Sequence, residues 1–375
     1  MKKLILSAAL CLILSAPALA EGLLRTTAQQ AIVVDNTTGQ VLFAKNADER
    51  MPTSSMSKAM TIYAVLEALK NESLYLTDTL LVSEKAWKKG GSKMFVEVDK
   101  RVKVEDLIRG VTVQSGNDAT IVLAEALAGS EDKFAAAITA KAKELGMENS
   151  NFANASGWPD PNHYSTARDL AVLANAIITN FPEYYHYFSE KEFTYNNIKQ
   201  RNRNPLLYRD IGADGLKTGH TEDGGYGLIG SGTHKDRRVT VVVNGLASEK
   251  ARAQEAAKLL EWGLRRFEIK TLVDAGTPLA SVDVAFGRKK QVNATVKNNL
   301  TLTVPLLLTG EITAEAMVKS PLIAPVQEGD EIGTLKINIP ELEPLTFPLY
   351  AAETIEEKSS LSMIFEKIPY LMGKK

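Results

Sequence analysis

The chain has 375 residues, of which 45% are hydrophobic and 24% charged, and its formal net charge is −1. That length predicts two domains, and the composition is that of an ordinary globular protein. The near-neutral charge argues against a nucleic-acid-binding protein, because such proteins carry a strongly basic surface.

The first twenty residues have the features of a secretory signal peptide. Lys2 and Lys3 precede an apolar run over 4–14, and Ala18-Leu19-Ala20 is a small-x-small cleavage site. The apolar run is too short to span a bilayer. We therefore expect residues 1–20 to be removed on export. Cys11 is the only cysteine of the chain and would be lost with them, so the mature protein has no disulfide and no thiol chemistry.

The next part of the chain predicts strands at both ends and helices between them. Strand patterns occur over 31–35, 40–44, 216–218, 226–232 and 239–245. Helical periodicity occurs over 55–70, 105–109, 119–127, 131–145, 167–178 and 251–267. This order predicts an α/β domain over 21–268, with one antiparallel sheet and a helical insert.

The pattern changes over 269–352, where short strand-like runs are separated by turns and no long helix is expected. The clearest runs are 284–286, 291–296, 300–304 and 332–337. This part predicts a small all-β sandwich domain. It contains no histidine, cysteine or tryptophan and shows no catalytic constellation.

The last segment, 353–375, predicts an amphipathic helix. One helical face collects the apolar side chains Leu361, Ile364, Phe365, Ile368, Leu371 and Met372. Such a helix can lie in a membrane interface, or it can dock on its own domain, and the pattern alone leaves both open. It cannot span a membrane because charged residues interrupt it, and Pro369 should kink or end it.

Three short motifs carry the chemistry. Ser55-Met56-Ser57-Lys58 places a serine and a lysine on one helical face, where the amine can reach the hydroxyl. A serine becomes a nucleophile only when a base takes its proton, and lysine serves as that base only if its pKa falls. Ser115-Gly116-Asn117 follows between two helices, and Lys217-Thr218-Gly219 lies on a strand, followed by His220.

Each motif alone is weak, but their combination and order are specific. The set S-x-x-K, S-D-N and K-T-G is typical of class A β-lactamases and penicillin-binding proteins, and this chain has Ser-Gly-Asn as its second motif. Rival chemistries fit poorly, since the sequence has no G-x-S-x-G elbow, no P-loop and no H-E-x-x-H spacing among its four histidines. We expect no cofactor and no metal.

At these residues the chain resembles the low-molecular-mass penicillin-binding proteins that act as D-alanyl-D-alanine carboxypeptidases, of the major enterobacterial type. The resemblance runs from about Ala31 to Phe267 and continues more weakly to the C-terminus. It is carried by four strings: Pro52 to Lys58, Val113 to Ala119, Asn202-Arg203-Asn204 and Gly215 to Thr221.

The resemblance implies a role for each matching residue. Ser55 would attack the carbonyl between the two terminal D-alanines of a peptidoglycan stem peptide, with Lys58 as general base and Ser115 as proton relay. The substrate would be bound by the Asn117 amide, by Lys217, and by Thr218, Arg203 and Arg252 at its terminal carboxylate. Gly219 would keep the strand open, and the N–H groups of Ser55 and His220 would form the oxyanion hole.

The resemblance also implies partners and a location. The stem peptide would be the substrate, β-lactams would be covalent inhibitors, and the C-terminal helix would anchor the protein on the periplasmic face of the membrane. Glu148-Asn149-Ser150-Asn151-Phe152 does not match the E-x-x-L-N motif of class A β-lactamases, so penicillin should acylate Ser55 and leave slowly. A D,D-endopeptidase, a β-lactamase and a non-catalytic envelope binding protein remain the alternatives.

Overall fold

A computed structural model describes residues 3–5 and 24–358 of the chain. The chain divides into two compact units. We call residues 24–266 the N-terminal unit, and residues 267–358 together with residues 3–5 the C-terminal unit. The expected signal peptide, apart from the short strand β1 (Lys3–Ile5), and residues 359–375 of the expected terminal helix lie outside the described residues.

The N-terminal unit is built on one five-stranded antiparallel sheet, as expected. The strand order is β3-β2-β10-β9-β8. The strands are β2 (Gln30–Asp35), β3 (Val41–Lys45), β8 (Ala213–Thr221), β9 (Gly225–His234) and β10 (Arg237–Leu246). The central strand β10 is apolar on both faces, with Val241, Val242 and Val243 all fully buried. Such a strand requires helices on both sides of the sheet.

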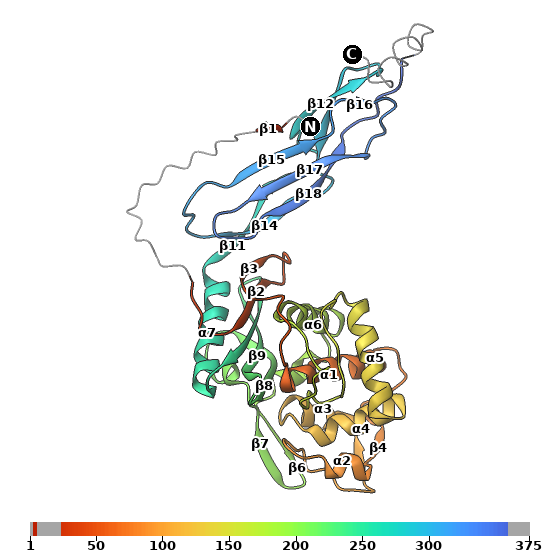
Figure 1. The fold of residues 1–375 in the computed structure, drawn as a ribbon, viewed down its shortest axis with the longest axis vertical. Coiled ribbons are helices and arrows are strands. Elements are labelled where there is room, and N and C mark those ends of the chain that lie inside the picture. Colours follow the sequence, from red (N-terminus) through yellow and green to blue (C-terminus); the bar gives the residue numbers. More distant parts are fainter. Residues whose placement is uncertain (1–2, 6–23, 359–375) are drawn as a thin grey trace. The chain divides into compact units, whose positions relative to one another are not determined.

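Helices cover both faces of this sheet (Figure 1). Helix α7 (Glu249–Arg265) packs on one face, and α1 (Lys58–Lys70) and α6 (Ala167–Asn180) pack on the other. The remaining helices are α2 (Glu84–Lys88), α3 (Val104–Thr112), α4 (Asn117–Ala128) and α5 (Glu131–Glu144). The helical insert expected from the sequence is therefore confirmed, and α2 is an addition that the periodicity does not predict.

Helix α1 runs through the core of this unit and carries the site at its start. Ile62 and Leu66 are at most 1% exposed, and burying a side chain of that size contributes about 1.5–3 kcal/mol. The expected helix start at Ser55 is wrong in detail. A 3₁₀ turn, η1 (Ser54–Ser57), precedes the α-helix.

Short elements on the periphery of the N-terminal unit have no clear signal in the sequence. They are the strand pairs β4 (Thr79–Leu81) with β5 (Arg101–Lys103) and β6 (Glu192–Tyr195) with β7 (Ile198–Arg201), and the turns η2 (Tyr185–Phe188) and η3 (Pro205–Tyr208). Their strands are largely exposed, so they lack the apolar runs that mark the central sheet.

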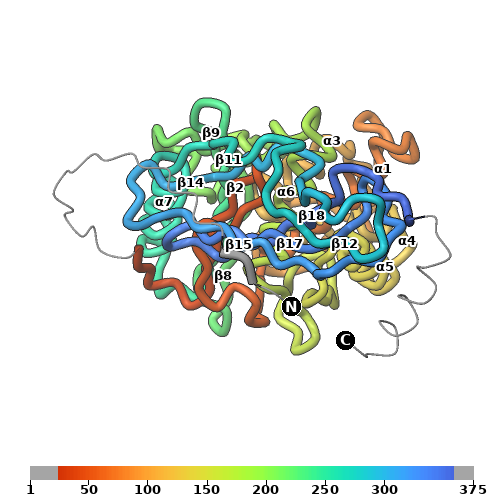
Figure 2. Tube along the Cα trace, turned by 90° about the horizontal axis from the view of Figure 1, so that it is seen from above, coloured from red at the N-terminus to blue at the C-terminus, as the bar shows by residue number. Residues whose placement is uncertain are grey.

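The C-terminal unit is all-β in its described part. Two sheets contribute side chains to one apolar core, among them Val292 and Leu335 from the large sheet and Leu302 from the small one. The small sheet pairs β11 (Phe267–Val273) with β14 (Leu300–Pro305). The large sheet has the order β1-β15-β17-β18-β13-β12-β16, with β12 (Ala280–Ala285), β13 (Gln291–Thr295), β15 (Thr313–Val318), β16 (Leu322–Ile323), β17 (Glu331–Asn338) and β18 (Leu345–Ala351). Figure 2 shows β15, β17 and β18 running side by side.

The C-terminal unit continues past the boundary expected at residue 352. Ile355 forms a bridge with Val326, and Glu357 forms a bridge with Gly287. Residues 353–358 therefore extend the β structure, where a helix was expected, because their backbone groups form bridges with the segments at Val326 and Gly287. Over residues 3–5 and 24–358, the structure contains no helix that is both long and apolar enough to cross a membrane.

Candidate active site

The site begins at the turn that carries Ser55. A 3₁₀ helix has three residues per turn, so side chains three apart are aligned along its axis. Ser55 lies in η1 and Lys58 follows as the first residue of α1, and Lys58 Nζ lies 2.7 Å from Ser55 Oγ. The same Nζ donates to the backbone carbonyl of Ser156 at 2.5 Å. The pairing of serine and lysine expected from the first motif is therefore present.

Lys58 is fully buried, and burial is the main reason that its pKa falls from 10.5 to about 7. A buried ammonium loses its hydration, which favours the neutral amine. The positive charges of Arg203 and Lys89 lower the pKa further, and the Asp118 carboxylate opposes them. Near neutral pH a substantial fraction of Lys58 is therefore an uncharged base beside the Ser55 hydroxyl.

A second serine–lysine pair joins the other two motifs. Ser115 lies between α3 and α4 with φ 61°, and Lys217 lies on β8. Lys217 Nζ donates to Ser115 Oγ at 2.9 Å and to the carbonyl of Thr218 at 3.1 Å. Burial holds the pKa of Lys217 well below 10.5, and the nearby charges of Lys58, Arg203 and Arg252 lower it further. Segments more than 100 residues apart thus meet at one cluster of amines and hydroxyls.

Asn117 is held against the loop over 89–96. Its side-chain amide donates to the carbonyl of Gly90 at 2.9 Å, and its backbone N–H donates to the carbonyl of Ser92 at 2.7 Å. The backbone of this loop fixes the position of the Asn117 amide.

Sequence reasoning missed Asp118, which fixes that loop. Its buried carboxylate accepts hydrogen bonds from the backbone N–H groups of Met94, Phe95, Val96 and Ala119, at 2.8 to 3.2 Å. Phe95 has φ 69°, an unusual conformation for a residue with a side chain, and these bonds hold it there. The one signal for Asp118 in the sequence is its position directly after Asn117.

Strand β8 lies at the edge of the sheet, as the third motif requires. Thr218 is nearly buried, and the exposed ring of His220 stacks on Tyr226 with 3.8 Å between ring centres. Gly219 allows β8 to approach η1. A Cβ atom there would lie 2.8 Å from the carbonyl oxygen of Thr53 and 3.1 Å from Met56 Cγ. The missing side chain at Gly219 thus makes room for the turn that carries Ser55.

The two arginines predicted for substrate binding differ in their surroundings. Arg203 is exposed and its Nη1 donates to Ser92 Oγ at 2.5 Å. Arg252 is 5% exposed, and its Nη1 donates to the carbonyl of Gly219 at 3.4 Å. Within the described residues its buried Nε has no hydrogen-bond partner. Buried polar groups are nearly always hydrogen-bonded, so this N–H lacks a partner that the described residues do not supply.

The loop over 153–163 was also missed by sequence reasoning. It provides the Ser156 carbonyl that binds Lys58, and Gly157 packs against the backbone of Ser54. A Cβ atom on Gly157 would lie only 1.8 Å from the Ser54 carbonyl oxygen, and Gly157 also has φ +75°. A cavity of about 470 Å³ opens beside Ser54, with Trp158 and Thr221 among its walls.

Comparison with known families accounts for both units. The family of D-alanyl-D-alanine carboxypeptidases matches residues 17–248, and the C-terminal domain of penicillin-binding protein 5 matches residues 267–357. The carboxypeptidase DacC of Escherichia coli K12 is 37% identical over 89% of this chain and 86% of its own length. The carboxypeptidase DacA of Haemophilus influenzae is 39% identical over 82% of this chain and 80% of its own length.

Solved structures agree with these matches. Penicillin-binding protein 5 from Haemophilus influenzae superimposes with a TM-score of 0.76 at 36% identity, covering 90% of this chain and 99% of its own. The carboxypeptidase DacD from Francisella tularensis gives 0.81 at 29% identity, covering 94% and 99%. Penicillin-binding protein D2 from Listeria monocytogenes, in its cefotaxime-bound form, gives 0.60 at 32% identity, covering 65% and 99%.

A serine hydroxyl beside a buried lysine of lowered pKa, on this fold, defines a serine peptidase of the penicillin-binding class. The chain belongs to the D-alanyl-D-alanine carboxypeptidase family, and it is a serine-type D-alanyl-D-alanine carboxypeptidase of the penicillin-binding protein 5 type.

Proposed function

We propose that Ser55 is the nucleophile of this carboxypeptidase and that Lys58 is its general base. The observation that carries the proposal is the 2.7 Å separation of Lys58 Nζ and Ser55 Oγ, with the Lys58 pKa at about 7. In its neutral form Lys58 keeps an N–H on the Ser156 carbonyl and turns its lone pair toward the Ser55 hydroxyl. A base whose pKa lies near the working pH is unprotonated in a large fraction of the molecules and still has a strong tendency to accept a proton.

The acylation step balances without any added group. Ser55 Oγ forms a bond to the carbonyl carbon between the two terminal D-alanines, and its proton passes to Lys58. The C–N bond then breaks, and D-alanine leaves with a proton relayed through Ser115, which is hydrogen-bonded to Lys217. The backbone N–H groups of Ser55 and His220 form the oxyanion hole, and one such donor is worth about 3 kcal/mol in the transition state.

Substrate binding is assigned to the residues around this cluster. The side-chain amide of Asn117 binds an amide group in the acyl part of the stem peptide. The stem peptide lies along the edge strand β8 and pairs with its backbone as an added strand. Lys217, Thr218, Arg203 and Arg252 surround the place of the terminal carboxylate. The unpartnered Nε of Arg252 supports its part in this set.

β-Lactams are proposed to acylate Ser55 and to leave slowly. Penicillin-binding protein D2 from Listeria monocytogenes has been crystallised with cefotaxime and with ampicillin bound, and it shares this fold. Glu148 is exposed and follows α5, so it is not the carboxylate that would prime a deacylating water. Without such a carboxylate, hydrolysis of the bulky acyl-enzyme is slow.

The direct test measures D-alanine release from a stem pentapeptide by the mature chain and by Ser55→Ala and Lys58→Ala. We expect release by the native protein and a loss of at least about 100-fold in both variants, since general base catalysis contributes about 10²–10⁴. Full activity of Ser55→Ala would remove the assignment. Release from cross-linked muropeptides would indicate an endopeptidase, and rapid hydrolysis of nitrocefin would indicate a β-lactamase.

We also propose an organisation of the chain: a signal peptide over 1–20, a catalytic domain over 21–266, a β domain over 267–358 and a terminal anchor within 359–375. The protein would be exported and held on the periplasmic face of the membrane by its terminal helix. The apolar face of Leu361 and Phe365 supports the anchor. Deletion after Ser359 should release the protein from sedimented membranes, and continued sedimentation of the shortened chain would count against the anchor.

A further inference from the structure

A buried hydrogen-bond network outside the three motifs holds the turn that carries Ser55. Ser57 Oγ lies 2.5 Å from Thr53 Oγ1 and 2.6 Å from His163 Nε2. Thr53 and Ser57 are at most 1% exposed, and His163 is 5% exposed. Ser57 lies between the two catalytic residues Ser55 and Lys58 in the sequence. The network therefore acts on the backbone that joins them.

The contacts of His163 fix its protonation state and the direction of its hydrogen bond. Its Nδ1 accepts the backbone N–H of Ala153 at 3.2 Å, so the proton of the neutral ring is on Nε2. Nε2 then donates to Ser57 Oγ, and Ser57 donates to Thr53 Oγ1. Burial lowers the pKa of His163 from 6.5 to about 4, with Lys58 adding to the shift and Asp160 opposing it, so the neutral ring persists at physiological pH.

The turn needs such support because its backbone is strained. Ser54 has φ 50°, the left-handed region that residues with a side chain rarely occupy. A strained conformation costs about 1–3 kcal/mol and persists only where the surroundings hold it. Gly157 packs against the Ser54 carbonyl on one side, and the Thr53–Ser57 hydrogen bond fixes the residues on either side of Ser54 and Ser55.

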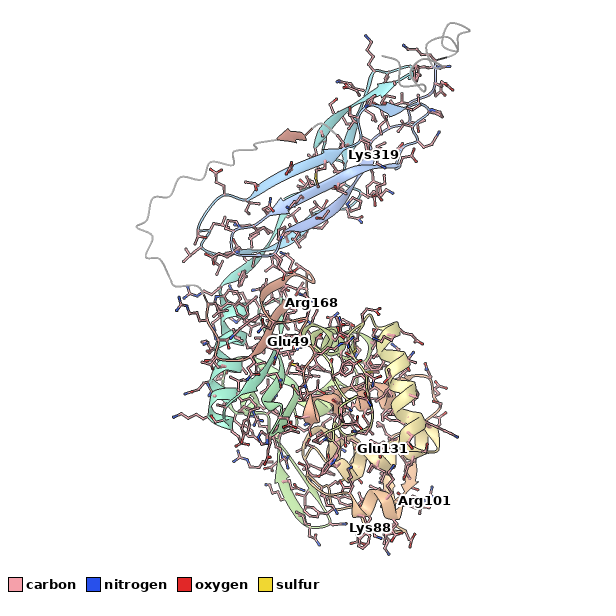
Figure 3. The ribbon with its side chains drawn as sticks, in the orientation of Figure 1. Glu49, Lys88, Arg101, Glu131, Arg168 and Lys319 are labelled. Atoms are coloured by element: carbon pink, nitrogen blue, oxygen red, sulfur yellow. The ribbon has the colours of Figure 1, made fainter. Side chains whose placement is uncertain are left out.

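The loop that carries His163 is itself firmly held. The backbone N–H of Ala155 donates to the buried carboxylate of Glu131 at 3.2 Å, and the carbonyl of Ala155 accepts from Thr61 Oγ1 at 2.6 Å. Figure 3 shows Glu131 among the helices of the N-terminal unit. The same loop provides the Ser156 carbonyl that binds Lys58. One rigid loop thus contacts Ser57 through His163 and Lys58 through its backbone.

We propose that His163 is a positioning residue for acylation: by donating from Nε2 to Ser57 it holds the turn that sets Ser55 Oγ against Lys58 Nζ. It does not touch the substrate or the reacting atoms. This inference rests on the proposed nucleophile Ser55 and base Lys58.

The test compares His163→Ala and His163→Gln in the mature chain, by acylation with a fluorescent penicillin and by turnover of a stem pentapeptide. The alanine variant should lose about five- to tenfold in acylation rate and in kcat, because one buried hydrogen bond is worth about 0.5–1.5 kcal/mol. Its KM should stay within about twofold, since the substrate-binding groups are untouched. Glutamine should restore most of the rate, because its amide N–H reaches the place of Nε2. The exposed His186→Ala is the matched control and should acylate at the native rate.

A double-mutant cycle separates positioning from general destabilisation. Ser57→Ala should lose at least as much as His163→Ala, because it removes the hydrogen bond to Thr53 as well as the one to His163. The double variant should be no slower than Ser57→Ala, because the His163–Ser57 contact is already broken in that variant. If His163→Ala does not fold, Ser57→Ala alone decides. Native acylation rates in folded His163→Ala or in Ser57→Ala would overturn the inference, and so would additive losses or failure of glutamine to rescue. Failure of the native chain itself to acylate would instead overturn the role of Ser55.

Discussion

The chemistry of this protein depends on Lys58, a side chain that is ordinarily charged and exposed but here is fully buried. Its Nζ is hydrogen-bonded to Ser55 Oγ and to the Ser156 carbonyl, and both hydrogen bonds can still form when the buried amine is neutral. The pKa of about 7 follows from that burial and from the positive charges of Arg203 and Lys89. A base of ordinary pKa would be protonated at neutral pH and could not accept the serine proton.

This gives a pH dependence with a definite sign. Acylation requires neutral Lys58, so the rate of penicillin acylation should rise with pH and reach half its plateau near pH 7. Stopped-flow or quenched acylation between pH 5 and 9 measures the profile. Lys58→Arg should be inactive across that range, because a guanidinium stays protonated. A profile that is flat from pH 6 to 9 would contradict the assignment of Lys58 as the base.

Asp118 offers a second prediction at the scale of one residue. Asp118→Asn replaces one carboxylate oxygen by an NH₂ group that faces backbone donors, so we expect a loss of about 2–4 kcal/mol in the free energy of unfolding. Acylation should slow as well, because the loop that holds Asn117 is released. Urea unfolding measures the first effect. The exposed Asp99→Asn, three residues beyond this loop, is the control and should change stability by less than about 0.5 kcal/mol. Equal stabilities of the two variants would refute this account of the loop.

The sequence predicts the motif residues well and the supporting residues poorly, for a physical reason. Ser55 and Lys58 can be predicted as a pair because they are three positions apart on one turn, so their contact is local. Ser115 and Lys217 meet across 102 positions, and only their family pattern links them in the sequence. His163 acts through a contact 106 positions away, to which no local pattern points.

At the scale of elements, the close approach of β8 to η1 assembles the site. The strand brings Lys217 to Ser115, and Gly219 lets its backbone lie against the turn before Ser55. The central strands and long helices could be predicted because buried elements have long apolar patterns. The short exposed pairs β4–β5 and β6–β7 could not, and the 3₁₀ start at Ser54 depends on tertiary contacts that a helical pattern does not contain.

Gly219→Ala tests this approach. The added Cβ would lie 2.8 Å from the Thr53 carbonyl oxygen, so the strand and the turn must separate. We expect acylation to fall at least about tenfold and stability to fall by about 1–3 kcal/mol, the usual effect of overpacking. Gly310→Ala, whose Cβ would meet nothing nearer than 3.4 Å, should leave both unchanged. Native acylation by Gly219→Ala would show that the contact with η1 is not needed.

At the scale of the whole molecule, each unit has a hydrophobic core of its own. All residues assigned to catalysis and substrate binding lie before Phe267. A unit with its own core and its own site is expected to fold and react alone.

The shortened chain 21–266 should therefore be folded and should acylate with penicillin within about twofold of the mature protein. Circular dichroism and the acylation rate check the two parts of this prediction. A matched fragment, 267–358, should be folded but should not react with penicillin. Loss of more than about tenfold in the acylation rate of a folded 21–266 chain would show that the C-terminal unit contributes to the site.

The central claim is that Ser55 is the residue that becomes acylated. Mass spectrometry of the mature protein after exposure to penicillin, with the modified peptide mapped, tests it most directly. The account predicts one adduct, carried by Ser55 in the peptide that contains Lys58, and no adduct on Ser55→Ala. An adduct on another residue, or an unchanged adduct in Ser55→Ala, would contradict it.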